Sequence, residues 1–269
     1  HTPSASRFVL EGKGGYTDIA GEKCRLERGD LVITPNGTWH DHGNEGPDEL
    51  IWVDILDVPL VEGLNATMFE FDYAEADPQS NSGEPVPTQY QSISTPDDHS
   101  NKLYAAGGMK PLFTDHRRGS GNHSPMFVYR WKVMREAFEK MRDYEGSPYD
   151  GIIVEYCDPS NGASVMPSMS FRAQMLRPGE ATRTHRHMSS TIYVVLEGEG
   201  WTEVDGERLE WGRNDVFVVP TWKWHAHANA SRTGDAVLYS VTDEPVLRML
   251  GLYREQTRTD DGAILPVAA

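Results

Sequence analysis

The chain contains little cysteine, few cationic side chains and no long apolar run. Its 269 residues include only two cysteines, Cys24 and Cys157, which is too few for a disulfide framework and fits a reducing compartment. There are 25 Lys and Arg residues against 41 Asp and Glu residues, so the formal net charge is −16. This charge argues against nucleic acid or an anionic membrane surface as a partner, because contacts to phosphate require basic patches. No apolar segment is long enough to cross a bilayer, and we therefore expect a cytoplasmic protein.

A histidine pattern occurs twice, far apart in the chain. Residues 29–44 and 215–229 both contain a proline, then a His-x-His pair, then an asparagine. The two pairs are His40 with His42 and His225 with His227. Each has a histidine upstream at nearly the same spacing, His1 at 39 residues before His40 and His187 at 38 residues before His225. The repeat predicts two similar units, each bringing histidines from separate strands to one point.

These histidines have the spacing of metal ligands. Residues two apart on a strand point to the same face, so His185 and His187 can both bind one ion. His225, from another strand, completes a triangle of ligands. In the first unit His1 and His40 are two such ligands, and the third is expected two residues before His1. A lone histidine near an apolar strand is more often a hydrogen-bonded structural residue, but coincidence explains poorly why the same pattern occurs in two units.

The two units resemble cupins. Residues 29–44 match the second cupin motif, G-x5-P-x-G-x2-H-x3-N, at every fixed position. The second copy keeps Pro220, His225 and Asn229 but has Asn214 and Trp222 in place of the glycines. Residues 179–187 match the other motif, G-x5-H-x-H, without the Glu ligand that normally follows it. Two cupin units that lack this Glu resemble the bicupin ring-cleaving dioxygenases typified by gentisate 1,2-dioxygenase.

The resemblance implies an all-β bicupin, with two jelly-roll barrels and a few helices in the connection. We expect an N-terminal barrel at residues 1–73, truncated at its start because the chain begins at a histidine, and a C-terminal barrel at 166–269. A linking segment at 74–165 contains one amphipathic helix. Ser124 is its N-cap, a proline follows, and apolar residues alternate four and three apart as far as Met141.

Short strands separated by Gly-rich turns are predicted within both units. In the first unit they are expected at residues 7–11, 16–19, 23–26, 31–34 and 50–56. Residues 193–243 repeat the order, with a hairpin turn at Asp205 and Gly206 where the first unit has Ala20 and Gly21.

The resemblance also implies a function, a non-haem Fe(II) enzyme that cleaves the ring of a hydroxybenzoate with dioxygen. Its expected substrate is gentisate and its product maleylpyruvate, and the family tends to form homotetramers. Three neutral imidazoles leave a divalent ion with its full charge, so an anionic substrate that chelates through a carboxylate and a neighbouring hydroxyl should bind strongly. Three protein ligands also leave positions open for both substrate and dioxygen.

Three further residues of the first unit are candidates for catalysis. Arg7 lies six residues after His1, so an unbroken strand aims it into the same cavity, where a guanidinium can clamp a carboxylate. In the family the matching Arg contacts the substrate carboxylate, and an acidic residue near the active site corresponds to Asp54. His42 is the candidate for proton transfer or for stabilising the developing peroxide. The second unit has Tyr193 and Ser240 where Arg7 and Asp54 stand, which makes its catalytic activity doubtful.

Several alternatives remain open at this point. Salicylate and 1-hydroxy-2-naphthoate share the carboxylate and hydroxyl of gentisate, and the sequence does not distinguish them. A non-catalytic cupin that binds a small molecule has no need of two histidine triads or of Arg7. A manganese cupin acting on oxalate would carry the missing Glu. His227 is as well explained by a structural role as by a functional one, and no catalytic part is expected for His99, His116 and His123.

Overall fold

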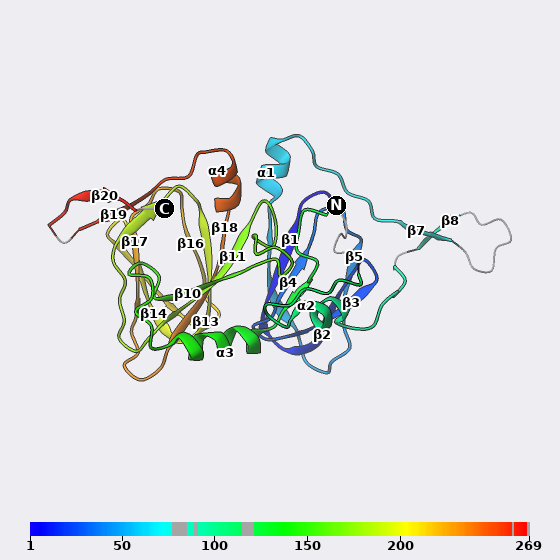
Figure 1. The fold of residues 1–269 in the computed structure, drawn as a ribbon, viewed down its shortest axis with the longest axis horizontal. Coiled ribbons are helices and arrows are strands. Elements are labelled where there is room, and N and C mark those ends of the chain that lie inside the picture. Colours follow the sequence, from blue (N-terminus) through cyan, green and yellow to red (C-terminus); the bar gives the residue numbers. More distant parts are fainter. Residues whose placement is uncertain (77–84, 89–90, 115–120, 260, 268–269) are drawn as a thin grey trace. The chain divides into compact units, whose positions relative to one another are not determined.

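The computed structural model describes residues 1–76, 85–88, 91–114, 121–259 and 261–267, and the chain divides into two compact units (Figure 1). The first consists of His1–Trp131 with Asp158–Ala163, and the second of Lys132–Cys157 with Ser164–Ala269. Both are built mainly of antiparallel strands, and the predicted all-β bicupin fold is confirmed. His116 lies outside the described residues.

The first unit forms a barrel from two facing sheets. Their strand orders are β6-β1-β4-β9 and β3-β2-β5. The strands are β1 (Ala5–Glu11), β2 (Lys13–Ile19), β3 (Glu22–Glu27), β4 (Leu31–Thr34), β5 (His40–Asn44), β6 (Ile51–Leu56) and β9 (Val128–Tyr129). Outside the barrel lie α1 (Val58–Gly63), the hairpin of β7 (Tyr73–Ala76) and β8 (Pro85–Thr88), and α2 (His99–Tyr104). Each predicted strand of this unit overlaps an observed one.

The second unit repeats this architecture with longer sheets. Their orders are β10-β11-β18-β13-β16 and β15-β14-β17-β12-β19-β20. The first sheet contains β10 (Ile152–Tyr156), β11 (Ser170–Leu176), β13 (Thr191–Glu197), β16 (Val216–Val219) and β18 (Ala236–Thr242). The second contains β12 (His185–His187), β14 (Glu199–Val204), β15 (Glu207–Gly212), β17 (His225–Asn229), β19 (Glu255–Arg258) and β20 (Ile264–Pro266). The helix α4 (Glu244–Met249) follows β18.

The same two-residue turn joins corresponding strands in both units. Asp205 and Gly206 have φ angles of 49° and 89°, and Ala20 and Gly21 have 49° and 78°. Two consecutive positive φ angles give a turn whose twist matches that of the flanking strands. The predicted hairpin at Asp205 and Gly206 is therefore confirmed, and the internal repeat extends to the backbone conformation of its turns.

The amphipathic helix begins later than the sequence pattern predicts. The helix α3 spans Trp131–Met141, whereas Ser124 was expected to be its N-cap. The intervening residues instead form β9, which pairs with β4 through Val128 and Tyr129, because ladder hydrogen bonds compete successfully with local helix propensity. The backbone N–H of Trp131 donates to Asp30 Oδ1 at 3.0 Å. A carboxylate from a distant turn therefore accepts a hydrogen bond from one of the first N–H groups of the helix.

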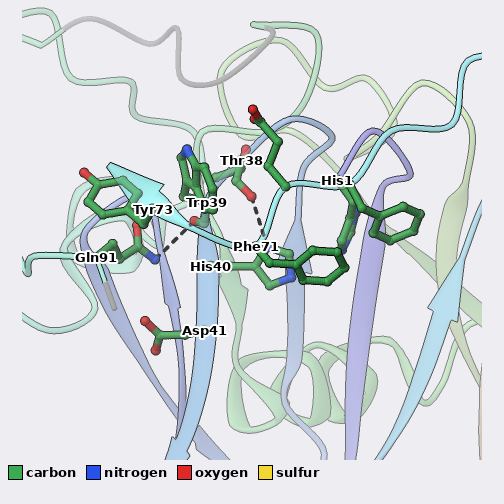
Figure 2. A pocket seen from close by; sticks show the side chains of 10 residues that line it. His1, Thr38, Trp39, His40, Asp41, Phe71, Tyr73 and Gln91 are labelled. Carbon is green, nitrogen blue, oxygen red and sulfur yellow. Dashed lines mark hydrogen bonds between the residues drawn. The ribbon is translucent and has the colours of Figure 1, made fainter. Parts of the chain in front are cut away.

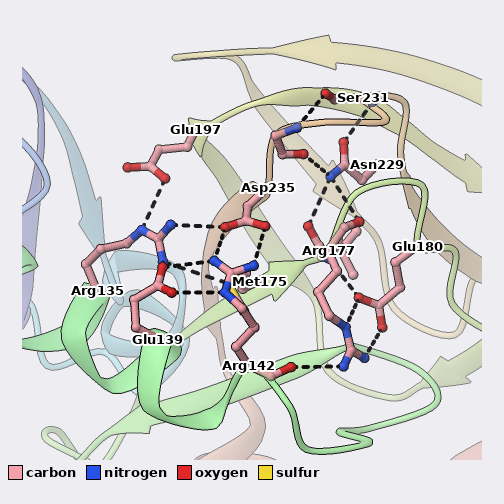
Figure 3. A network of polar contacts seen from close by, with 12 residues as sticks. Arg135, Glu139, Arg142, Met175, Arg177, Glu180, Glu197, Asn229, Ser231 and Asp235 are labelled. Atoms are coloured by element: carbon pink, nitrogen blue, oxygen red, sulfur yellow. Dashed lines mark hydrogen bonds and ion pairs between the residues drawn. The ribbon is translucent and has the colours of Figure 1, made fainter.

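A network of charges ties the later turns of α3 to the second barrel (Figure 3). Asp235 is its centre, with Oδ2 at 3.0 Å from Arg135 Nη2 and Oδ1 at 2.8 Å from Arg142 Nη1. Glu139, one turn along the helix, also accepts from both arginines. The hydrogen bonds from Arg142 hold the pKa of Asp235 below its usual value, so this anchor stays charged at neutral pH.

Asp18, on β2, is a buried carboxylate with an incomplete set of partners. It is 2% exposed, it lies opposite Asp41, and its Oδ1 has no hydrogen-bond partner among the described residues. Burial, and then repulsion by Asp41, raises the pKa of Asp18 from 3.8 to about 6. The folded chain therefore binds this proton more tightly than the unfolded chain does.

We expect Asp18→Asn to raise the melting temperature, and to raise it more at pH 8 than at pH 5. Stability is lost as the pH rises from the unfolded pKa of 3.8 through the folded value of about 6, and a neutral amide does not suffer this loss. Thermal unfolding followed by circular dichroism measures the effect, with Glu49→Gln at an exposed site as the matched control. A gain that is the same at both pH values would show that Asp18 does not carry the raised pKa.

Candidate metal and substrate sites

Three histidines converge in the second barrel. His185 and His187 come from β12 and His225 comes from β17, and the ligand nitrogens of the three lie within 4.8 Å of one another. Strand pairing places His185 directly opposite His225, and their ring centroids are 4.3 Å apart. His187 lies two residues from His185 on the same face of the strand, as a period of two requires. The structure thus brings together the three side chains that the sequence singled out.

Each of these imidazoles is fixed through its Nδ1 atom, so that Nε2 is left for a ligand. His185 Nδ1 lies 3.1 Å from Glu255 Oε1, His187 Nδ1 lies 2.8 Å from the Ser189 carbonyl, and His225 Nδ1 lies 3.0 Å from the Lys223 carbonyl. Such outer partners select the tautomer and orientation of metal-binding histidines.

The Nε2 atoms of His185 and His225 are buried and have no hydrogen-bond partner among the described residues. Burial, followed by neighbouring His185, lowers the pKa of His187 and of His225, which keeps both imidazoles neutral. Neutral imidazoles with unpartnered Nε2 atoms are what a divalent ion requires of its ligands, so these residues fit a metal ion.

The first barrel has two histidines in the equivalent arrangement (Figure 2). The ring centroids of His1 and His40 are 4.8 Å apart. His1 Nδ1 is 2.7 Å from the Pro3 carbonyl and His40 Nδ1 is 3.0 Å from the Thr38 carbonyl, which again leaves Nε2 for a ligand. Burial, with the Arg7 charge nearby, lowers the pKa of His40 to about 4. Both side chains are therefore suited to bind a metal ion, and the predicted contact between them is present.

An aromatic cavity lies beside this pair. It measures about 210 Å³, and its walls include the rings of Trp39, Phe69, Phe71 and Tyr73 (Figure 2). Phe69 packs on His1 with ring centroids 5.3 Å apart, and Phe71 is 81% exposed. Sequence reasoning missed these side chains, although aromatic residues at every second position from Phe69 to Tyr73 were a usable signal. Such walls suit a planar aromatic ligand.

Arg7 lies in the interior of the first barrel and contacts Asp54. The two residues are paired across β1 and β6, and Arg7 Nε lies 2.8 Å from Asp54 Oδ1. Arg7 Nη1 donates to Thr34 Oγ1 at 2.8 Å, and Asp54 also accepts from Trp52 Nε1 at 3.0 Å. Arg7 is only 5% exposed, so it is not a surface charge. It does not line the aromatic cavity itself.

The His42 ring packs against two other rings, those of His40 and Trp52. Its ring centroid is 5.5 Å from those of both His40 and Trp52, and its Nδ1 atom is 3.0 Å from Thr17 Oγ1. Although His42 is one of the exposed residues of β5, desolvation by its neighbours, followed by the charge on Arg7 and by His40, lowers its pKa to about 3. The side chain is therefore neutral at physiological pH.

His227 occupies the position in the second barrel that His42 occupies in the first. Its Nδ1 atom is 2.8 Å from Thr202 Oγ1, and the pairing of Thr202 with His227 repeats that of Thr17 with His42. The His227 ring is fully buried and packs on Tyr193, with centroids 4.8 Å apart. Like the Nε2 atoms of His185 and His225, that of His227 is buried with no hydrogen-bond partner among the described residues.

Tyr193 and Ser240 face each other in the second barrel as Arg7 and Asp54 do in the first. The interior cation of the first barrel is thus absent from this position of the second.

Of the histidines for which no catalytic part was expected, His99 begins α2 and His123 is buried with Nδ1 2.8 Å from the Ser124 carbonyl.

Comparisons with known proteins point in one direction. The sequence pattern of the cupin domain family matches residues 1–56 and 173–242. A 5-aminosalicylate 1,2-dioxygenase from Comamonas sp is 41% identical over 97% of this chain and 65% of that protein. Gentisate 1,2 dioxygenase 1 from Aquipseudomonas alcaligenes is 36% identical over 95% of this chain and 68% of that protein.

Among solved structures, a salicylate 1,2-dioxygenase from Pseudaminobacter salicylatoxidans is similar over 95% of this chain and 69% of its own, with a TM-score of 0.80 and 26% identity. The chain thus spans 65% to 69% of the length of these three proteins. No helix in the described part of the chain is long and apolar enough to cross a membrane.

Proposed function

This chain belongs to the family of bicupin ring-cleaving dioxygenases that includes gentisate 1,2-dioxygenase, and we propose that it cleaves the ring of a hydroxybenzoate with dioxygen. The proposed substrate is gentisate and the product is maleylpyruvate. The observation that carries this proposal is the first barrel itself. A pair of histidines oriented for a metal lines an aromatic cavity there, and the buried Arg7 guanidinium, outside that lining, is close enough to lower the pKa of His40.

The proposed cofactor is Fe(II), which His1 and His40 would hold in the first barrel. When bound, Fe(II) supplies open coordination positions and the redox chemistry by which dioxygen reacts with an aromatic ring. His185, His187 and His225 would hold a second ion.

Arg7 has the task of binding the substrate carboxylate. One of its five N–H donors is used by Thr34, and Nε lies close to Asp54 without forming a hydrogen bond to it. The remaining donors are left for a further carboxylate. Because the guanidinium is buried, its attraction to an anion is screened less than it would be at the surface. Asp54 and Thr34 fix its position, so little side-chain freedom remains to be lost when the substrate binds.

His42 has the task of accepting a proton from the substrate hydroxyl. In the tautomer whose Nδ1–H donates to Thr17 Oγ1, Nε2 carries a free lone pair that can accept the proton. The lowered pKa favours the neutral ring, which is the form that has this lone pair. The aromatic rings of the cavity exclude water from the faces of the substrate ring.

Oxygen uptake by Fe(II)-loaded protein, including any residues that precede His1, tests the function. Gentisate, 5-aminosalicylate, salicylate and 1-hydroxy-2-naphthoate are offered separately. We expect the highest kcat/KM with gentisate and the next highest with 5-aminosalicylate, which carries an amino group in place of the para hydroxyl. No uptake with any of the four acids would refute the proposal, and preference for salicylate would reassign the substrate.

The proposed second ion predicts a measurable loss of metal. We expect His225→Ala to lower the metal content per chain, because two imidazoles bind a divalent ion far more weakly than three. Metal analysis by mass spectrometry after anaerobic reconstitution gives the content, and His99→Ala, at the start of α2, is the matched control. An unchanged content in His225→Ala would remove the second site.

We further propose that the protein works in the cytoplasm as a homotetramer, as the family resemblance implies. Sedimentation velocity of the 30.1 kDa chain would reveal a monomer or dimer directly.

A further inference from the structure

The second barrel encloses a polar cavity next to its histidines. The cavity measures about 180 Å³, and both His185 and His187 line it. On the opposite sheet, alternate residues of β11, β13 and β18 project into it, since residues two apart on a strand share a face. These are Arg172, Gln174, Thr191, Tyr193, Ser240 and Thr242. A barrel interior so rich in hydrogen-bonding groups is unusual, because such interiors are normally filled by apolar side chains.

Gln174 is the informative member of this wall. Its side chain is 1% exposed, and its Nε2 atom is buried with no hydrogen-bond partner among the described residues. Buried amide nitrogens nearly always have a partner, and an exception calls for a bound molecule or another explanation. Because Gln174 lines the cavity, its two N–H donors are available to a molecule inside it.

The charges around the cavity define the charge of that molecule. Glu244 bridges two arginines, with Oε2 at 2.7 Å from Arg172 and Oε1 at 2.5 Å from Arg248. Asp150 and Glu255 bring the lining to two cations and three carboxylates, a formal charge of −1. A divalent ion bound to the three histidines changes this to +1, which a monoanion would neutralise.

The second cavity also differs from the first in what it can enclose. Trp39, Phe69 and Phe71 supply aromatic walls in the first barrel. In the second, the aromatic side chains of the lining are tyrosines, Tyr193 and Tyr253, and Tyr253 uses its hydroxyl to donate to Glu255 at 3.1 Å. Polar walls of this kind favour an aliphatic, hydrogen-bonding molecule over an aromatic ring.

We propose that the second barrel binds a small aliphatic 2-oxo or 2-hydroxy carboxylate, with Gln174 Nε2 donating to its carboxylate. A carboxylate oxygen and the neighbouring oxo or hydroxy oxygen would chelate an ion held by His185, His187 and His225, so this inference rests on the proposed metal site of the second barrel. Arg172 adds long-range attraction for the anion while remaining paired with Glu244. Such a site is separate from ring cleavage, although the ring-opened product of the proposed reaction is itself a 2-oxo carboxylate.

The test uses Co(II), whose visible absorption reports its coordination, in protein carrying His40→Ala so that the spectrum comes from the second barrel. Lactate, pyruvate, acetate, salicylate and the ring-opened product of gentisate are titrated separately. We expect lactate and pyruvate to change the spectrum in a saturable way, and acetate and salicylate to do so at least tenfold more weakly. Tighter binding of the ring-opened product than of pyruvate would identify the enzyme's own product as the source, and the reverse would identify a simpler acid.

Variants of Gln174 give the second readout. Gln174→Leu keeps the volume of the side chain and removes its donors, and Gln174→Glu adds a repelling carboxylate. Both should retain Co(II) while binding pyruvate about tenfold or more weakly, as expected for a lost hydrogen bond to a charged group. Gln174→Leu should also keep the parent melting temperature, whereas the buried carboxylate of Gln174→Glu should lower it. Glu203→Gln, exposed on β14, is the control and should bind like the parent.

Different failures would identify different errors. A His40→Ala protein that holds no Co(II) would remove the metal site and this inference with it. Retained Co(II) whose spectrum no acid changes, or equal binding by Gln174→Leu and the parent, would overturn the ligand site alone.

Discussion

Replacing His40 by alanine is expected to abolish ring cleavage, whereas replacing His225 should leave most of the turnover intact. His40 is one of the two described ligand candidates of the first barrel, and its loss leaves the metal too few ligands to be held. His225 serves the second barrel, where Tyr193 and Ser240 stand in place of Arg7 and Asp54. Tyr193 can donate one hydrogen bond to a carboxylate but cannot neutralise it.

Steady-state oxygen uptake with gentisate compares the two variants, and metal content and melting temperature are measured alongside. The expected pattern is a loss of turnover in His40→Ala, with one metal site retained, and near-parent turnover in His225→Ala. Equal loss in both, with both proteins folded, would mean that the two barrels are both catalytic or depend on each other.

Replacing Arg7 by alanine should lower kcat/KM by about 2 to 3 kcal/mol, roughly 30- to 150-fold, mainly through a higher KM. The lost interaction is a charge-assisted hydrogen bond to the substrate carboxylate. Arg7→Lys should recover part of the loss, because it restores the charge without the planar fork of donors. Lys13→Ala, on the exposed side of β2, is the control for removing a cation.

Removing Arg7 also leaves Asp54 without its ion-pair partner, so the structural effect must be separated from the binding effect. Asp54→Asn breaks the same ion pair while keeping the guanidinium. We expect it to retain far more substrate affinity than Arg7→Ala does. A KM that rises equally in both variants would mean that Arg7 acts by holding the barrel together rather than by binding the substrate.

The sequence predicted the parts of the site that depend on local periodicity. The positions of His185 and His187 follow from the period of two along a strand, and that of His225 follows from the repeated motif. The hairpin at Asp205 and Gly206 follows from the conformations that these residue types tolerate. Such features are specified by residues close together in the chain, so a pattern of ten or twenty residues is enough to reveal them.

Features that depend on tertiary pairing were predicted less well. The start of α3 was wrong because Val128 and Tyr129 pair with β4, a partner about a hundred residues away in the sequence. Phe69 and Phe71 reach the cavity from a segment beyond the first barrel's last predicted strand. Gln174 gave no signal at all, since its significance depends on the partner that its buried amide lacks.

The most direct measurement of the proposed reaction is the fate of labelled oxygen. Fe(II)-loaded protein is given gentisate under ¹⁸O2, and the ring-opened product is analysed promptly by mass spectrometry. Cleavage of the ring by a dioxygenase predicts one O2 consumed per gentisate and incorporation of label from both oxygen atoms, apart from any exchange with water. Incorporation of a single atom with the ring intact, or oxygen uptake without ring opening, would contradict the assignment of this chain as a ring-cleaving dioxygenase.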